Sequence, residues 1–123
     1  MRTVGRFRRL IAGEDFAVLG REVGRCGLER LADAWREFRP IEKLILFKLM
    51  EPKRAFAFYA RLDFDGKYFL LCAFDRNTIA PVLDKASRPV RALFKTLPAS
   101  YYDRMLRLLA SEQVEIQLTV RDN

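Results

Sequence analysis

Six basic residues near the end of the chain have the spacing of a binding surface. Intervals of three or four residues separate the first four of them, which places neighbours on one side of a helix. Guanidinium and ammonium groups in such a row bind carboxylates, phosphates or a nucleic-acid backbone. The predicted partner-binding basic face consists of Lys85, Arg88, Arg91, Lys95, Arg104 and Arg107.

The helix that carries this face is predicted to begin near Ser87 and Pro89, because both residue types favour the first turn of a helix. Lys85 then lies just outside the helix. Arg104 and Arg107 extend the face from the following helix. The alternative interpretation is a solvated outer face that binds nothing, since runs of charged side chains often serve only to keep a helix in water.

The side chains that usually perform catalysis or hold metals do not form complete sets. The chain has no histidine, which excludes histidine triads, histidine acid–base pairs and histidine metal sites. Cys26 and Cys72 are too few for a four-cysteine zinc site, and no base that would activate either thiol is evident. We therefore expect no enzyme activity, no cofactor and no metal site.

Two motifs with the look of ligand-binding loops are also incomplete. Asp63, Asp65 and Gly66 resemble the start of a calcium loop, but Phe74 occupies the twelfth position, where such a loop needs a glutamate. We expect instead that Asp63 caps a helix and that Asp65 lies in its first turn. The glycine series between residues 20 and 27 lacks the preceding strand and the Lys-Ser/Thr pair of a phosphate-binding loop.

The chain as a whole is basic, with 23 Lys and Arg against 16 Asp and Glu and a net charge of +7. This charge favours acidic partners, either an acidic protein surface or a nucleic acid. The densest excess lies at the start, where four arginines precede the first acidic residue, Glu14. We predict an exposed basic helix or a frayed arm there, with contact to acidic lipid or nucleic acid as the alternative.

The apolar runs are short. The run that follows the basic start, residues 10–12, is too short for the core of a signal peptide. The longest uncharged runs, such as residues 68–74, are too short to span a bilayer. We expect a cytoplasmic protein with no membrane span and with reduced thiols.

Residues that favour helix starts punctuate the chain at intervals of 11 or 12 positions: Pro40, Pro52, Asp63, Asp75, Ser87 and Pro98. Apolar residues at helical spacing fill the segments between them, and helices this short are stable only when they pack on neighbours. We therefore predict an all-α fold, a right-handed superhelix of short antiparallel helix pairs of the armadillo type. A β-hairpin that turns at Asp65 and Gly66 is the alternative for one segment.

Three parts are predicted along the chain: a basic helical segment over 1–27, a helical repeat domain over 28–110 and an extended tail over 111–123. The first part contains a helix over 14–22, and Gly24 and Gly27 break the chain after it. The repeat domain opens with a helix over 28–38. Apolar and polar residues alternate in the tail, so it can also pair as a strand with a second copy or with another protein.

Four pieces of the region from Leu28 to Leu109 have a pattern in common with a known family. The pieces are LERLADAWREFRP, EKLILFKLMEPKRAFAFYARLD, IAPVLDKA, and VRALFKTLP followed by RMLRLL. They resemble the cytosolic N-terminal domain of MgtE-type magnesium transporters. The resemblance implies an all-helical superhelix similar to domains of the flagellar motor-switch protein FliG.

The chain departs from this family where the family is acidic. Asp33 keeps the acid of the opening motif, but Arg30 stands in place of its histidine, and Arg88 and Pro89 stand in place of an acidic pair. Magnesium prefers carboxylate and water oxygens, so a basic surface is a poor magnesium sensor. The resemblance therefore implies a shared scaffold and a different activity.

The predicted function is a non-catalytic helical-repeat module for protein interaction or regulation. Its partner is expected to be an acidic protein surface, or a second copy bound through the tail. Two alternatives stand beside this prediction. One is an electrostatic nucleic-acid-binding protein, and the other is a magnesium-linked regulatory domain.

Overall fold

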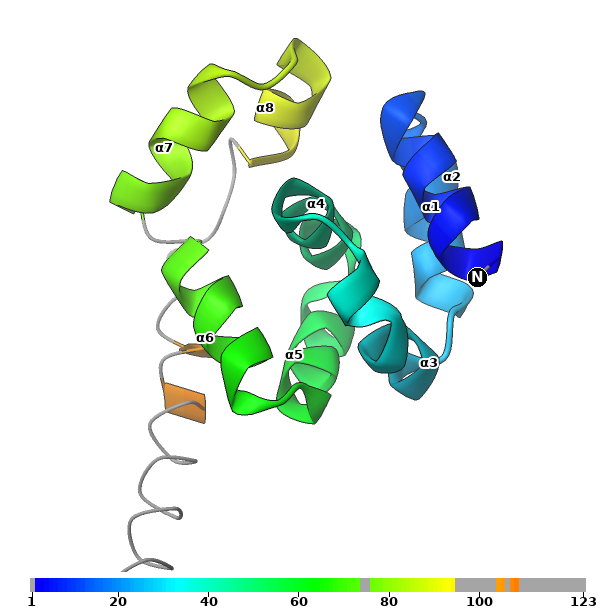
Figure 1. Ribbon diagram of the computed structural model, residues 1–123, viewed down its shortest axis with the longest axis vertical. Helices are drawn as coiled ribbons and strands as arrows, with labels where there is room; N and C mark the ends of the chain where they lie inside the picture. Colours follow the sequence, from blue (N-terminus) through cyan, green and yellow to red (C-terminus); the bar gives the residue numbers. More distant parts are fainter. Residues whose placement is uncertain (1, 74–75, 95–103, 106, 109–123) are drawn as a thin grey trace, which may run out of the picture.

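The computed structural model describes residues 2–73, 76–94, 104, 105, 107 and 108, and the elements in this part of the chain are helical (Figure 1). The predicted all-α class is therefore confirmed for the described residues. Asp65 and Gly66 lie inside a helix, so the alternative of a β-hairpin at this position is wrong. Pro98 and the predicted tail over 111–123 lie outside the described residues.

The first third of the chain forms three helices and a short 3₁₀ turn. They are α1 (Arg2–Ala12), α2 (Phe16–Arg25), α3 (Leu28–Ala34) and η1 (Trp35–Glu37). The helix predicted over 14–22 begins and ends later, because Gly24 does not interrupt it. The chain turns instead at Cys26 and Gly27, whose backbones are extended.

Five helices follow, and their first residues match the predicted punctuation. They are α4 (Pro40–Leu49), α5 (Pro52–Arg61), α6 (Phe64–Ala73), α7 (Arg76–Asp84) and α8 (Arg88–Phe94). Proline opens α4 and α5, where its missing N–H group is not needed and its fixed φ suits the helix. Helix starts are thus decided by short-range chemistry, which the sequence displays directly.

Side-chain caps support two of these starts. The carboxylate Oδ1 of Asp63 accepts a hydrogen bond of 2.8 Å from the backbone N–H of Gly66 at the start of α6. The hydroxyl of Ser87 accepts one of 3.4 Å from the N–H of Val90 at the start of α8. Each cap satisfies a backbone donor that the first turn of a helix leaves without a partner.

A single hydrophobic cluster connects the helices. It extends from Val4 in α1 to Met105, and its largest fully buried side chains include Tyr59, Phe47 and Phe58. Helix α4 lies in the middle of the molecule, between the α1–α2 pair and α8 (Figure 1). Four consecutive residues of α4, 44–47, are buried, as expected for a helix with neighbours on all sides.

The basic start of the chain forms a helix with exposed arginines, which is one of the two predicted forms, but it is not a frayed arm. Val4 and Phe7 of α1 are buried, and the ring of Phe7 stacks on that of Phe38 with centroids 6.3 Å apart. Leu19 and Val23 of α2 are fully buried as well. The apolar residues between the arginines therefore fix α1 and α2 to the same core that holds α3 to α8.

None of the helices in the described part of the chain has the length and apolar character needed to cross a membrane. The longest elements have 10 or 11 residues, whereas a spanning helix needs about 20.

Candidate partner-binding groove

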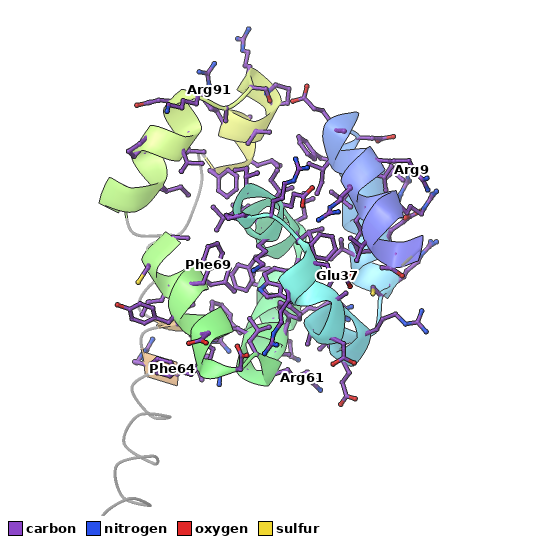
Figure 2. The ribbon with its side chains drawn as sticks, in the orientation of Figure 1. Arg9, Glu37, Arg61, Phe64, Phe69 and Arg91 are labelled. Atoms are coloured by element: carbon purple, nitrogen blue, oxygen red, sulfur yellow. The ribbon has the colours of Figure 1, made fainter. Side chains whose placement is uncertain are left out.

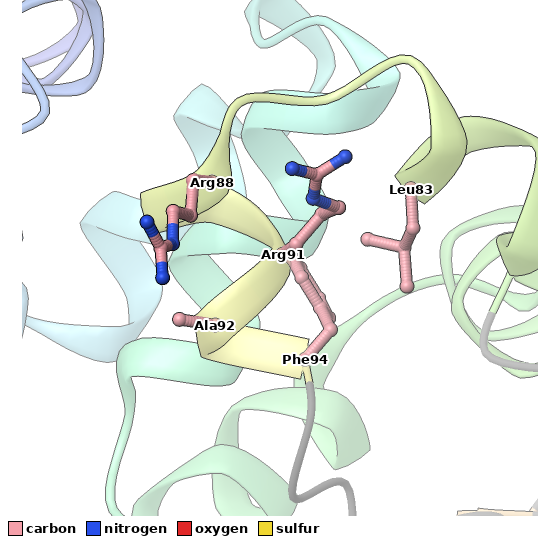
Figure 3. A pocket seen from close by; sticks show the side chains of 5 residues that line it. All are labelled: Leu83, Arg88, Arg91, Ala92 and Phe94. Atoms are coloured by element: carbon pink, nitrogen blue, oxygen red, sulfur yellow. The ribbon is translucent and has the colours of Figure 1, made fainter.

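Two of the predicted basic residues, Arg88 and Arg91, line a groove of about 380 Å³ beside α8 (Figure 3). Leu83 of α7 contributes to the same lining, together with Ala92 and Phe94 of α8. The groove therefore combines an apolar surface with two guanidinium groups. This combination suits a partner segment that carries both an apolar side chain and carboxylates.

Local chemistry fixes the position of α8. Ser87 caps the helix and also donates a hydrogen bond from its hydroxyl to the carboxylate of Glu14, in the turn between α1 and α2. Phe94 at the other end of α8 is buried in the core. The two arginines consequently project from a helix that is held at both ends, which favours a defined orientation for binding.

Arg88 and Arg91 are exposed, and neither side chain has an ion pair or a hydrogen bond with another described residue. Lys85, in the turn before α8, is also exposed, and its side chain has no ion pair or hydrogen bond with a described residue. Figure 2 shows Arg91 at the surface of α8, well separated from Arg9 on α1. These three cations are therefore available to carboxylates or phosphates from outside the molecule.

The rest of the predicted basic face does not extend this surface. The guanidinium carbon of Arg104 lies 4.3 Å from the ring centroid of Phe56 in α5, a cation–π contact. In Figure 1, the short segments 104–105 and 107–108 lie away from α8, and Arg107 is exposed. Lys95 lies outside the described residues. Among the described members of the six, Arg88 and Arg91 share the groove, and Lys85 precedes them in the turn before α8.

Two arginines at the start of the chain, Arg6 and Arg8, have structural partners instead. Arg6 donates from Nε to both carboxylate oxygens of Glu22, at 2.8 and 2.6 Å. This contact lowers the pKa of the Glu22 carboxyl below its ordinary value, chiefly through the hydrogen bond. Arg8 pairs with Glu42 at 3.3 Å and also donates to the backbone carbonyl of Glu37. The sequence analysis missed these pairs because their members are 16 to 34 residues apart.

Arg54 has a further structural role that the sequence analysis missed. Its guanidinium donates to the carbonyl oxygens of Val23 and Cys26, where α2 ends. A cation at the C-terminus of a helix satisfies free carbonyl groups and is favoured by the helix dipole. Arg54 thereby ties α5 to the end of α2.

A second pocket, of about 370 Å³, lies where α3 and η1 meet the α5–α6 connection. Its lining consists of Ala32, Asp33, Trp35, Arg36, Arg61, Leu62 and Asp63. Arg36 pairs with Asp63 at 3.2 Å. The pKa of Asp63 is lowered, first by the hydrogen bond from Gly66 and then by Arg36. Sequence analysis did not predict this pocket, because its residues come from two segments about 30 positions apart.

No group of three or more acidic, cysteine or histidine side chains within the described residues is arranged to hold a metal ion. Cys26 and Cys72 are half-buried thiols that form no disulfide. Burial raises the pKa of the Cys26 thiol, and the nearby Arg30 and Arg54 only oppose this effect. A thiol with a raised pKa is a weak nucleophile near neutral pH.

Comparison with known proteins found no match for this chain among protein-family models, curated proteins or solved structures. The similarity to MgtE-type domains therefore stays a prediction from sequence motifs. The groove, the second pocket and the charge distribution are the observations on which a functional proposal can be built.

Proposed function

We propose that this chain is a non-catalytic helical-repeat module that binds an acidic protein segment in the groove beside α8. The observation that carries the proposal is that Arg88 and Arg91 flank an apolar groove and have no side-chain partner in the described part of the chain. Some other arginines have acceptors within the protein, as with Arg6, Arg8 and Arg54. Arg9 and Arg21 are unpaired among the described residues, but they line no described groove. Unpaired guanidinium groups beside an apolar surface are better explained by a partner than by stability.

The partner segment is expected to carry an apolar anchor with carboxylates on either side. The anchor packs against Leu83, Ala92 and Phe94, and burying one large aliphatic or aromatic side chain contributes about 1.5–3 kcal/mol. The carboxylates pair with the two arginines at the rim. Because the rim is exposed, these pairs mainly accelerate association and make it sensitive to salt.

The scaffold we propose is a right-handed superhelix of short helix pairs, like that of MgtE N-terminal domains and of FliG. The regular helix starts from Pro40 to Ser87 support this assignment. Arg88 occupies a place that is acidic in the MgtE family, which favours an acidic partner over magnesium. The two unbonded cysteines agree with a cytoplasmic location, where thiols stay reduced.

Fluorescein-labelled peptides test the proposal directly. One peptide carries glutamates around a single leucine, a second replaces the leucine with serine, and a third replaces the glutamates with lysines. We expect fluorescence anisotropy to detect binding of the first peptide alone. We also expect its affinity to fall severalfold between about 50 and about 300 mM salt, because rim charges are screened over this range.

The matched variants are Arg88→Ser with Arg91→Ser, and Arg9→Ser with Arg21→Ser. Both pairs remove two exposed arginines whose side chains have no partner among the described residues. The first pair of substitutions should lower the affinity for the acidic peptide at least tenfold. The second pair should change this affinity less than twofold. Equal losses in both pairs would show general attraction to a basic protein and would contradict a specific groove.

Duplex DNA and single-stranded RNA oligonucleotides serve as competitors in the same assay. If the groove recognises a protein segment, they displace the peptide only at low salt. Tight oligonucleotide binding that is lost with Arg88 and Arg91, while the leucine proves unnecessary in the peptide, would instead support the nucleic-acid alternative.

A further inference from the structure

The pocket at the junction of α3, η1, α5 and α6 has the composition of a site for a small ligand, separate from the α8 groove. Ala32, Trp35 and Leu62 form its apolar part. Trp35 and Leu62 are buried and belong to the core, so this part of the pocket is held by the fold itself. Four charged side chains, two acidic and two basic, complete the lining.

Two of these charges are matched within the protein and two are not. Arg36 pairs with Asp63, and Asp63 also caps α6. Arg61 donates from Nη1 to the carbonyl of Ala57 at 3.0 Å, which leaves its other guanidinium donors available. Asp33 is exposed and has no hydrogen bond or ion pair with a described residue. Arg61 and Asp33 thus line one pocket as opposite charges that do not pair with each other.

The indole of Trp35 adds an unsatisfied donor. Its Nε1 is buried and has no acceptor among the described residues. The ring itself is held by edge contacts to Phe58 and Phe38, with centroids 4.8 and 6.3 Å away. The indole nitrogen is almost fully shielded from solvent, so a ligand in the pocket meets the exposed charges and the apolar lining and not this donor.

We infer that this pocket binds a small zwitterion with a carboxylate and an ammonium group, such as a free α-amino acid. The carboxylate pairs with Arg61, and the ammonium pairs with Asp33. The side chain of the ligand packs on Ala32 and Leu62. A volume of about 370 Å³ accommodates a free amino acid together with water.

Both charges of the ligand are needed for this recognition. A simple anion that approaches Arg61 also meets the negative charges of Asp33 and Asp63. A simple cation that approaches Asp33 meets Arg36 and Arg61. Only a ligand with both charges complements the pocket on both sides, because each of its charges then meets an opposite charge of the protein.

The chain has one tryptophan, so its emission reports on this pocket directly. The experiment titrates the protein with the standard amino acids other than tyrosine and tryptophan, which emit light themselves. We expect a saturable change in Trp35 emission and a rise in melting temperature with at least one amino acid. The N-acetylated and the carboxamide forms of that amino acid, which each lack one charge, should bind at least tenfold more weakly.

Two variants separate the ends of the ligand. Arg61→Gln should abolish discrimination against the carboxamide form, and Asp33→Asn should abolish discrimination against the N-acetyl form. Both residues are exposed, so the folded state should persist, and circular dichroism checks this. Arg88→Gln, in the other pocket, is the control and should leave amino-acid binding unchanged, which keeps this inference independent of the proposed peptide groove.

Three results would overturn the inference. The first is the absence of any change in emission or melting temperature with every amino acid up to millimolar concentration. The second is equal binding of the zwitterion and its singly charged analogues. The third is unchanged discrimination in folded Arg61→Gln and Asp33→Asn proteins.

Discussion

Arg6 and Arg8 of α1 are paired within the protein, whereas Arg88 and Arg91 of α8 are unpaired among the described residues, although the sequence makes both regions basic. Arg6 and Arg8 pair with Glu22 and Glu42, so their charges hold α1 against its neighbours. Arg88 and Arg91 have no side-chain partner in the described part of the chain and stand beside an apolar groove. Charge density in the sequence is therefore a poor guide to binding, because acceptors from distant segments can occupy a basic residue.

The two regions also differ in how their backbone ends are satisfied. The end of α2 receives a guanidinium from α5, which uses Arg54 as part of the fold. The start of α8 is capped by its own Ser87, so its arginines are not required for this purpose. Substitutions in the two regions should consequently have different effects on folding and on binding.

The largest effect on stability is expected from Arg54→Met. The change removes hydrogen bonds to the carbonyls of Val23 and Cys26 in a partly buried setting. We expect the free energy of unfolding to fall by about 2–3 kcal/mol, the usual range for bonds that involve a charged donor. Urea unfolding measures it, with Lys53→Met on the exposed side of the same helix as the control. Equal effects of both variants would show that the hydrogen bonds of Arg54 do not stabilise the fold.

Glu42→Ala should have the next largest effect. The Glu42 carboxylate accepts a bond of 2.7 Å from the backbone N–H of Arg39 and pairs with Arg8. Losing this cap at the start of α4 should lower the free energy of unfolding by about 1–2 kcal/mol. Glu42→Gln keeps an acceptor for Arg39 and should lose clearly less, as measured by thermal and urea unfolding. A glutamine variant as unstable as the alanine variant would mean that the charge, and not the cap, is what matters.

Asp63→Ala should lower the free energy of unfolding by about 1 kcal/mol, since it removes the cap of α6. Asp63→Asn keeps an acceptor and tests the charge through pH. The pKa of Asp63 is lowered in the folded state, so the carboxylate adds stability at neutral pH. This contribution is lost as the pH falls from the ordinary aspartate value through the lowered one. The difference in stability between the wild type and Asp63→Asn should therefore shrink between about pH 6 and about pH 2.

The smallest effect on stability belongs to the double variant Arg88→Ser and Arg91→Ser. Neither side chain contacts a described partner, so the free energy of unfolding should change by less than about 0.5 kcal/mol. The same variant should lose its binding of the acidic peptide. It is therefore expected to affect binding and not stability, whereas Arg54→Met is expected to affect stability. A loss in the free energy of unfolding as large as that of Arg54→Met would show that Arg88 and Arg91 stabilise the fold as Arg54 does. It would contradict the difference between the two regions.

Local signals in the sequence predicted the helices well. Pro40, Pro52 and Ser87 act on their own first turns through fixed φ angles or side-chain caps, so their effects need no knowledge of the fold. At the N-terminus the predicted basic helix is present, but the alternative of a frayed arm is wrong, because α1 is packed. The prediction there rested on the arginines and took no account of Val4 and Phe7. The burial of these two apolar side chains decides where the helix lies.

The candidate sites were less accessible to prediction. Arg88 and Arg91 were identified because residues three apart on one helix are neighbours in any fold. Their apolar companion Leu83 belongs to another helix. Arg104 was assigned to the same face, but it lies over Phe56 of α5, since helix packing and not sequence order sets its position. The pocket that contains Asp33 and Arg61 had no sequence signal at all.

By itself, the sequence determined the helical class, most helix boundaries, the basic charge and the lack of histidine chemistry. These properties depend on residue types and on contacts within one or two turns of a helix. Only the tertiary structure decided which arginines find acceptors, which remain available, and which distant charges line a common pocket. The physical reason is that ion pairs and pockets depend on distances of a few ångströms between helices, and such distances follow from the packing of the whole core.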